Sequence, residues 1–520
     1  MSFSTVVTRP GHFQKNLFFR ICLCTCLLVT ACGTEPSPST PARAGLAAYA
    51  AAITQVAQPT PTVNPKLPWL VNPLFQLINT PFTSEMSSDG FTWSQAYPIQ
   101  VDRYNNIFVL AQQNNSGDHK FIFSNDAGKS WAENSLEEKY MTRGSAAYDS
   151  RNDKIHVLWN AAMPNDGIIY RRYDIKRNKS NEILSITPDA RINLQLDFQT
   201  GGTMLYEHPV LLWLGDKESG KDGRLVAVWS AHNDAAPVTN EIRVSQRLLS
   251  NSAEDGRANA WRAFMSDSSP PVATGAISPT AVDNLPQVAY SPIFASTKAG
   301  IPYSSALVKT SGKHARDVYF FYSNGTTTWE WRRAGWNSQT NDWSNGLTPP
   351  DVISKISRSG TDSGYTLKQQ LGSKPVEDIR NDRVFFGFAT WKDNTQGDTW
   401  SHVFVDASDN LSEVADVYSA GKIHSYAPTG DITFDQVSGK LVTLYLKTDK
   451  AGIYAQLYDG KLPVGPESLV FNSEEGDIPL LWQGGRYEVN NQAKLLVLFR
   501  SITRPYHGYF GTIDLLRPAR

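Results

Sequence analysis

Short apolar runs bounded by polar turns recur along the chain from about residue 95 onward. In each unit a turn leads into four or five apolar residues, and a polar loop then leads into a second run of alternating character. The seven apolar runs are Ile107–Leu110, Ile155–Trp159, Leu225–Trp229, Val318–Tyr322, Val384–Phe388, Leu441–Tyr445 and Leu495–Phe499. The runs that follow them are Phe121–Phe123, Ile168–Tyr173, Glu241–Val244, Trp329–Arg332, Ser401–Val405, Ile453–Leu457 and Tyr509–Ile513. Runs this short, bounded by Gly, Asn and Asp, predict β-strands rather than helices.

The repetition of this unit predicts an all-β protein with a single β-propeller over residues 66–520. A continuous apolar second strand fits the middle of a blade, where both faces are buried between neighbouring blades. Seven blades fit the repeats, six is the alternative number, and a pair of β-sandwich domains is the alternative fold. The last unit ends near Leu516, which leaves no room for a fourth strand. We therefore expect an N-terminal strand, around Phe91–Trp93, to complete the last blade.

The N-terminal segment predicts export and membrane attachment. Residues 1–31 are expected to be a secretory leader: the first 20 residues contain Arg9, Lys15 and Arg20 but no acidic residue, and the apolar run that follows, Ile21–Ala31, is too short to span a bilayer. The run ends in Val-Thr-Ala-Cys at Cys32, which resembles the lipobox of bacterial lipoproteins. This resemblance implies cleavage before Cys32, lipidation of that cysteine, and an extracytoplasmic location on the cell membrane or the outer membrane. Residues 32–65, rich in Pro and Ala, are expected to form a tether.

Composition narrows the possible partners. All four cysteines lie at or before Cys32, so the folded part has no disulfide and no cysteine metal site. The chain has 49 basic and 50 acidic residues, and removal of the three basic residues of the leader makes the mature chain slightly acidic. Without a basic tract, nucleic acid is not an expected partner. No cofactor or metal is predicted; Asp- and Asn-rich loops could hold Ca²⁺, but none has EF-hand spacing.

The segment Ser124–Trp131, which reads SNDAGKSW, directly follows a predicted third strand. It resembles the Asp-box, S-x-D-x-G-x-x-W, of the sialidase-like (BNR repeat) β-propellers, in which this turn joins the third and fourth strands of a blade. Asp126 can accept backbone N–H groups, Gly128 permits a positive φ, and Trp131 can pack under the hairpin. Together with Ser124, these residues are expected to be structural. Shorter copies occur at Ser87–Trp93 and Ser323–Trp329.

The same resemblance implies which residues an active site of this protein would contain. Sialidases of this superfamily use three arginines, a tyrosine nucleophile assisted by glutamate, and an aspartate acid/base. The strand before the first Asp-box lacks the arginine of the family's Arg-Ile-Pro signature, since it reads AYPIQVD over residues 96–102. Tyr206, Glu207 and His208, at the entrance of a predicted inner strand, are the candidate catalytic residues, with hydrogen bonding inside the blade as the alternative.

Polar loops after the second strands are the candidate ligand-binding region. In a propeller these loops emerge at one rim, where Trp can stack on sugars and Asn or Asp can bind hydroxyls. The candidate ligand-binding residues are Arg143, His232, Asn233, Asp234, Trp391, Asp393, Arg500 and Arg504. We therefore expect a surface lipoprotein that binds an extracellular ligand, with a glycan as the predicted ligand. A divergent sialidase-like hydrolase or polysaccharide lyase, and a protein-interaction platform in the envelope, are the alternatives; the oligomeric state is open.

Overall fold

The computed structural model describes residues 70–77, 91–93, 99–113, 119–136, 141–161, 167–189, 191–196, 204–215, 223–233, 239–249, 261–263, 291–296, 304–323, 329–347, 351–353, 372–391, 398–419, 430–436, 438–447, 452–472, 480–482, 486–489, 492–500 and 508–515. All of them belong to one compact unit, Pro59–Arg520. These residues form antiparallel β-sheets and contain no helix, which confirms the predicted all-β class. No helix among them is long and apolar enough to cross a membrane.

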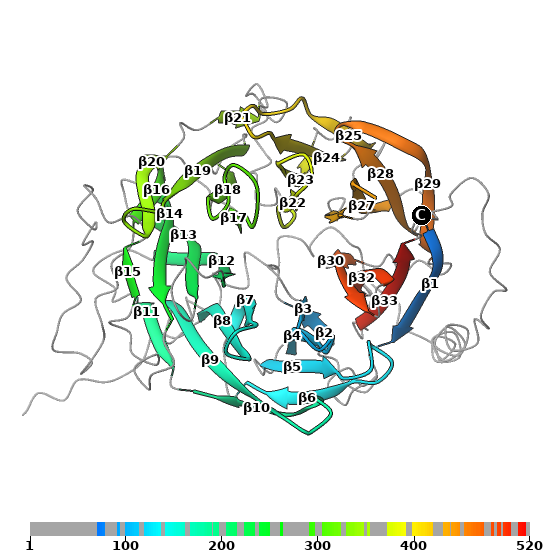
Figure 1. Ribbon diagram of the computed structural model, residues 1–520, viewed down its shortest axis with the longest axis horizontal. Helices are drawn as coiled ribbons and strands as arrows, with labels where there is room; N and C mark the ends of the chain where they lie inside the picture. Colours follow the sequence, from blue (N-terminus) through cyan, green and yellow to red (C-terminus); the bar gives the residue numbers. More distant parts are fainter. Residues whose placement is uncertain are drawn as a thin grey trace, which may run out of the picture. The chain divides into compact units, whose positions relative to one another are not determined.

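Seven sheets follow one another in chain order and can be traced by their labels in Figure 1. Sheet 1 contains β2 (Phe91–Trp93), β3 (Ile99–Val101), β4 (Ile107–Gln113), β5 (His119–Ser124) and β6 (Ala132–Ser135). Sheet 2 contains β7 (Met141–Asp149), β8 (Lys154–Ala161), β9 (Gly167–Arg177), β10 (Ile183–Pro188) and β11 (Ile192–Leu196). Sheet 3 contains β12 (Met204–Leu214), β13 (Arg224–Asn233), β14 (Thr239–Leu248), β15 (Trp261–Ala263) and β16 (Ser291–Ser296). Sheet 4 contains β17 (Ser304–Val308), β18 (Val318–Ser323), β19 (Trp329–Asn337), β20 (Asp342–Leu347) and β21 (Asp351–Ile353).

The remaining sheets have the same order of antiparallel neighbours. Sheet 5 contains β22 (Val376–Asp378), β23 (Arg383–Trp391), β24 (Asp398–Val405) and β25 (Ala415–Ser419). Sheet 6 contains β26 (Gly430–Asp435), β27 (Lys440–Lys447), β28 (Gly452–Asp459) and β29 (Leu462–Asn472). Sheet 7 contains β30 (Leu480–Trp482), β31 (Arg486–Val489), β32 (Gln492–Arg500), β33 (Gly508–Leu515) and β1 (Leu70–Leu77). Each sheet therefore has four strand positions, and a sheet with five strands has one position split into two short strands that pair with the same neighbour.

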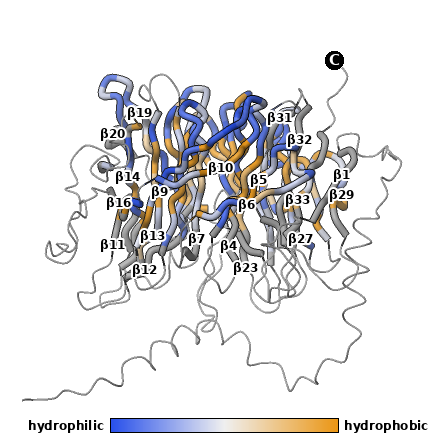
Figure 2. Tube along the Cα trace, turned by 90° about the horizontal axis from the view of Figure 1, so that it is seen from below, coloured by the Kyte–Doolittle hydropathy of each residue, from blue (hydrophilic) through white to orange (hydrophobic). Residues whose placement is uncertain are grey.

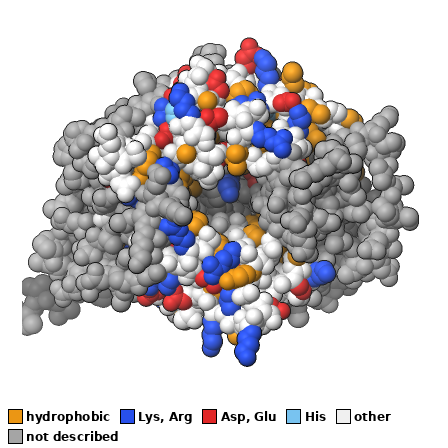
Figure 3. All heavy atoms as spheres, in the orientation of Figure 1, with side chains coloured by type: hydrophobic (Ala, Val, Ile, Leu, Met, Phe, Trp, Pro, Cys, Tyr) orange, Lys and Arg blue, Asp and Glu red, His pale blue; other side chains and the backbone are white. Residues whose placement is uncertain are grey.

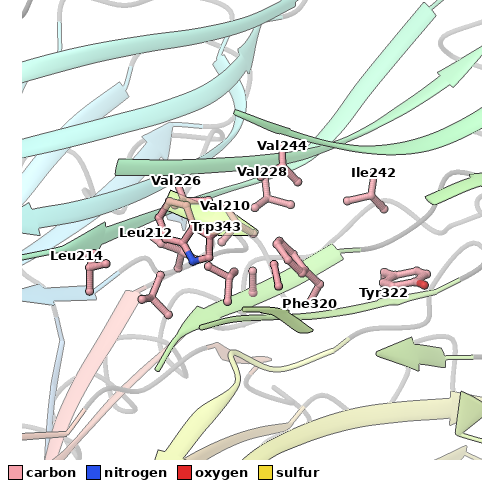
Figure 4. Packing of buried hydrophobic residues seen from close by; sticks show 14 residues of the cluster. Val210, Leu212, Leu214, Val226, Val228, Ile242, Val244, Phe320, Tyr322 and Trp343 are labelled. Atoms are coloured by element: carbon pink, nitrogen blue, oxygen red, sulfur yellow. The ribbon is translucent and has the colours of Figure 1, made fainter. Parts of the chain in front are cut away.

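The predicted apolar runs all lie in the second strands, and the runs that follow them all lie in the third strands. Burial on both faces explains the continuous apolar pattern. In β18, Phe320 packs into a cluster shared with sheet 3, whereas Tyr319 and Phe321 pack into a cluster shared with sheet 5. Figure 4 shows the first of these clusters, in which Val226 and Val228 of β13 approach Phe320. Each such side chain contributes about 1.5–3 kcal/mol by leaving water.

Consecutive sheets contact one another throughout the series. Buried clusters join sheets 1 and 2, 2 and 3, 3 and 4, 4 and 5, and 5 and 6. Strands β26 and β27 of sheet 6 contact β30 of sheet 7. The rings of Trp131 in sheet 1 and Phe510 in sheet 7 pack edge to face, with their centroids 5.0 Å apart. Figure 2 shows the hydrophobic middles of the strands and the hydrophilic turns at one end.

We name that end of each sheet its turn edge, because it carries the turns between the first and second strands and between the third and fourth. The first strands of sheets 2 and 5 end here at a fully buried aspartate. Asp149 accepts hydrogen bonds from the amides of Arg151 and Asn152, at 2.9 and 3.1 Å, and Asp378 caps the equivalent turn of sheet 5 in the same way. The sequence pattern Asp-x-x-Asn before a second strand therefore specifies a tight turn.

Side chains also connect the turn edges of neighbouring sheets. Glu377 of sheet 5 accepts hydrogen bonds from the backbone and hydroxyl groups of both Thr310 and Ser311 in sheet 4, at 2.6–3.0 Å. Lys309 of sheet 4 forms an ion pair with Asp382 of sheet 5. Because Glu377 and Lys309 are buried, these contacts fix the two sheets relative to each other.

The turn Ser124–Trp131 has the geometry expected from its sequence. Asp126 accepts the amide of Ser130 at 2.8 Å, Gly128 has a φ of 90°, and the indole of Trp131 donates to the carbonyl of Gly128 at 3.1 Å. A Cβ at Gly128 would lie 2.2 Å from the ring of Phe510. The glycine is thus required both by its backbone conformation and by the close approach of sheet 7.

Two expectations about strand order are wrong. An N-terminal strand does complete sheet 7, but it is β1 at Leu70–Leu77, which pairs with β33; Phe91–Trp93 pairs with β4 in sheet 1 instead. The segment Ser323–Trp329 connects a second strand to a third strand, so it does not occupy the position of an Asp-box. Both segments have a plausible local pattern, but the partner of a strand is decided by tertiary packing. The other short copy, at 87–93, lies mostly outside the described residues.

Candidate functional site

The end of each sheet opposite its turn edge is named here its loop edge, because the first strand begins and the second strand ends there. The described candidate residues of the sequence analysis all lie at loop edges. Arg143 is in β7; Tyr206, Glu207 and His208 are in β12; His232 and Asn233 end β13; Trp391 ends β23; and Arg500 ends β32. Asp234, Asp393, Arg504 and Cys32 lie outside the described residues. The backbone therefore places candidates from sheets 2, 3, 5 and 7 at equivalent positions.

The segment Tyr206–Pro209 forms a β-bulge in the first strand of sheet 3. Glu207 is opposite Ser230 and Val210 is opposite Val228, so β12 has one more residue than β13 between these two pairs. His208, within the bulge, is half-buried and has a φ of 52°, in the left-handed region that residues with a side chain adopt uncommonly, although Asn, Asp and His do so more often than the others. Proline at 209 has no N–H for the sheet ladder, which explains locally why the strand bulges here.

A second polar feature lies where the first strands of sheets 5 and 6 begin. Lys374 is half-buried in the irregular segment just before β22, and Asp431 is buried near the start of β26. Burial lowers the pKa of the Lys374 ammonium, and the negative charge of Asp431 opposes this effect. A lysine that keeps some contact with solvent while its charge is disfavoured can bind a negatively charged group or accept a proton.

Serine and glutamine side chains connect the first strands of several neighbouring sheets. Ser145 of β7 accepts the amide of Leu211 in β12 at 3.0 Å, and Ser305 of β17 donates to the carbonyl of Ser373 at 3.0 Å. Gln100 of β3 donates to the carbonyl of Ala146 in β7 at 2.8 Å. These bonds position the backbone of sheets 1 and 2, 2 and 3, and 4 and 5 next to each other.

Described tyrosine–glutamate pairs occur elsewhere and do not resemble an activated nucleophile. Tyr445 donates to Glu467 at 2.6 Å in sheet 6, and Tyr322 donates to Glu330 at 3.1 Å in sheet 4. Both phenols are fully buried, and burial together with the neighbouring carboxylate raises the pKa of each phenol. A raised pKa means that less of each phenol is ionised to the nucleophilic phenolate. These pairs therefore stabilise the sheets and are not arranged for nucleophilic attack.

Lys374, Asp431 and the serines that connect the first strands were not predicted from the sequence. The only signal for Lys374 is its place between Ser373 and Pro375, directly before β22. Among the described residues, no group of three or more His, Cys, Asp or Glu side chains is arranged to hold a metal ion.

Comparison with known proteins gives likeness at the level of solved structures. No protein-family model and no curated protein matches the chain. The polysaccharide lyase Uly1 is 10% identical, with 81% of this chain and 90% of that chain covered and a TM-score of 0.43. A NanB sialidase variant from Streptococcus pneumoniae is 11% identical, with 85% and 70% covered and a TM-score of 0.40. The SapL1 lectin is 10% identical, with 74% and 98% covered and a TM-score of 0.33.

Proposed function

We propose that the protein is a surface lipoprotein, anchored through Cys32, whose seven sheets form a closed seven-bladed β-propeller of the sialidase-like type. The series of contacts between consecutive sheets, together with the packing of Phe510 of sheet 7 on Trp131 of sheet 1, supports closure. The pairing of β1 with β33 supplies the outer strand of the last blade. In such a ring the first strands surround the axis, and their loop edges form one common rim.

We propose that this rim binds an extracellular glycan. The observation that carries the proposal is that His208, in the bulge of a first strand and at positive φ, and Lys374, just before another first strand, both lie at loop edges. A bulge re-aims a side chain, and strained backbone is concentrated at functional positions. Imidazole and ammonium groups at a rim can hydrogen-bond to sugar hydroxyls and to an acidic substituent. The candidates Arg143, His232, Trp391 and Arg500 would extend the same surface.

Binding to a glycan array by the full-length protein tests this proposal, followed by affinity measurement with the best glycan. His208→Gly removes the imidazole while accepting the backbone conformation, and Lys374→Met removes the amine while keeping the apolar stem. We expect each substitution to weaken Kd about tenfold or more, since a hydrogen bond to a charged group is worth about 1.5–3 kcal/mol. Leu469→Ser, an exposed position in the fourth strand of sheet 6, is the matched control and should bind as the wild type does. Wild-type affinity in both rim variants would contradict the proposed site.

A glycan-processing enzyme is the second candidate, and the strained backbone at His208 is the observation that favours it. Tyr206, Glu207 and His208 would supply acid, base or nucleophile in a sialidase-like hydrolase or a polysaccharide lyase. The test is product release from a fluorogenic sialoside and from the glycans that the array retains. Turnover that is lost in Tyr206→Phe while binding persists would establish catalysis; binding without turnover would leave the protein a lectin-like receptor.

A further inference from the structure

Exposed apolar side chains at three turn edges each stand next to an exposed basic side chain. Tyr104, Ile379 and Leu462 are 36%, 46% and 65% exposed, and they lie at the tips of turns in sheets 1, 5 and 6. Their sequence neighbours Arg103, Arg380 and Lys461 are exposed as well. The same pairing of a cation with a large apolar group thus recurs on three sheets.

The aspartates that begin the turns of sheets 1 and 5 point in the other direction. Asp102 and Asp378 are at most 4% exposed, because they turn inward to the sheet ends that they follow. Asp102, for example, accepts the amides of Tyr104 and Asn106, both at 2.8 Å. The turns of sheets 1 and 5 therefore bury these two carboxylates and project Arg103 and Arg380, whereas Asp459 beside the turn of sheet 6 is exposed. Figure 3 shows Lys and Arg side chains on this side of the molecule, together with Asp and Glu side chains and hydrophobic ones.

Two exposed carboxylates near these tips are already paired. Asp459 forms an ion pair with Lys440, and Glu413, which is 81% exposed, forms one with Lys461. Pairs this exposed contribute little to stability, so they can open when another anion approaches. Tyr104 is covered on its ring by the guanidinium groups of Arg103 and Arg177, at 4.9 and 4.8 Å from the ring centroid. Cationic and aromatic groups in this arrangement suit a polar–apolar boundary.

The course of the chain supplies an independent indication of what this side faces. Strand β33 runs from the loop edge to the turn edge, and Leu515 at its end pairs with Leu70 at the start of β1. The described part of the chain thus begins at a turn edge. A lipid anchor at Cys32, as proposed above, would therefore be joined to the described sheets at this edge.

We propose that the turn edges of sheets 5, 6 and 1 form a docking surface for an anionic phospholipid membrane. Arg103, Arg380 and Lys461 contact lipid phosphates, while Tyr104, Ile379 and Leu462 enter the headgroup layer. Each basic residue near an anionic membrane surface favours the docked state by about fivefold. Docking on this side directs the loop edges away from the membrane. The inference does not depend on what the loop edges bind.

Amide hydrogen exchange of the full-length protein tests docking. The protein is mixed with vesicles of phosphatidylcholine alone or of phosphatidylcholine with phosphatidylglycerol. We expect peptides that cover residues 102–106, 378–383 and 459–462 to be protected only by the anionic vesicles, and peptides that cover 204–214 to be unaffected. The triple variant Arg103→Ser, Arg380→Ser and Lys461→Ser should lower the docked-to-free ratio on the order of 100-fold. Glu413→Gln should raise it, because it releases Lys461.

Matched controls separate docking from general charge effects. Arg191→Ser and Leu469→Ser remove an exposed basic side chain just before β11 and an exposed apolar side chain from β29, both away from the turn tips, and should leave the protection intact. Equal protection by both kinds of vesicle, protection of residues 204–214 instead, or full protection in the triple variant would each overturn the proposal. Protection of the turn peptides that rises with protein concentration in the absence of vesicles would also overturn the proposal, because it would show that a second copy of the chain covers this surface. Loss of glycan binding has no bearing on any of these results.

Discussion

His402 gives a test of the packing between sheets 5 and 6 that can be worked out in numbers. Its imidazole is fully buried in β24, edge to face with the ring of Tyr458 at 4.6 Å between centroids, and its Nε2 lies 3.1 Å from the carbonyl of Gly460. Burial lowers the pKa of His402 to about 4, with the Gly460 carbonyl opposing part of the effect. The folded protein therefore keeps this side chain neutral under conditions where an exposed histidine is protonated.

The direction in which stability changes with pH follows from the difference between the pKa of His402 in the folded and in the unfolded chain. Below a pH of about 6.5 the unfolded chain takes up a proton at His402 that the folded chain does not, so stability falls with pH until the folded pKa is reached. A difference of between two and three pKa units corresponds to about 3 kcal/mol of unfolding free energy, lost between about pH 7 and about pH 4. Because the group is fully buried, solvent screening does not reduce this figure appreciably.

Urea unfolding of the wild type and of His402→Gln at about pH 7, 5 and 4 measures the effect. Other buried groups, such as His156, titrate alike in both proteins, so the difference between the two unfolding free energies isolates His402. We expect the variant to be less stable at neutral pH, and the gap to shrink or reverse by about 3 kcal/mol on acidification. A gap that stays constant with pH would show that His402 is not held neutral between these sheets, and the described packing would be wrong there.

Three further changes probe the assembly of the sheets. Gly128→Ala should destabilise the fold by about 1–3 kcal/mol in thermal or urea unfolding, through positive φ and the clash with Phe510, whereas Ala127→Gly, at a φ of 61°, should not. Glu377→Gln should cost about 1–3 kcal/mol because it weakens the acceptor shared by Thr310 and Ser311, and an unchanged melting temperature would argue against that connection. Deletion of residues 66–77 should lower the melting temperature of the whole unit in one cooperative step, since β33 loses β1; normal melting would argue against closure at this strand.

The second strands were the most predictable part of the fold, and their environment explains why. A strand such as β18 alternates between two buried clusters, so every residue is apolar and the run is visible in the sequence. First strands lack this signal because they are short or irregular, as the bulge at His208 and the split between β2 and β3 show. The choice between Leu70–Leu77 and Phe91–Trp93 as the partner of β33 depends on contacts far apart in the sequence.

The candidate site was predictable only as a position along the repeat. Placing Tyr206, His232 and Trp391 at the ends of predicted strands was sufficient to bring them to loop edges once the sheets were aligned. Lys374 and Asp431 belong to different units, and their proximity arises only because sheets 5 and 6 pack against each other. A side chain whose role depends on its neighbour in another sheet leaves no pattern in its own stretch of sequence.

The central claim is that the beginnings of the first strands form a glycan site. The most direct measurement is an experimental structure of the full-length protein with the glycan that it binds best on the array. We expect sugar density in contact with His208 and Lys374. Density on the flanks of the sheets or among the turns, with these two residues untouched, would contradict it.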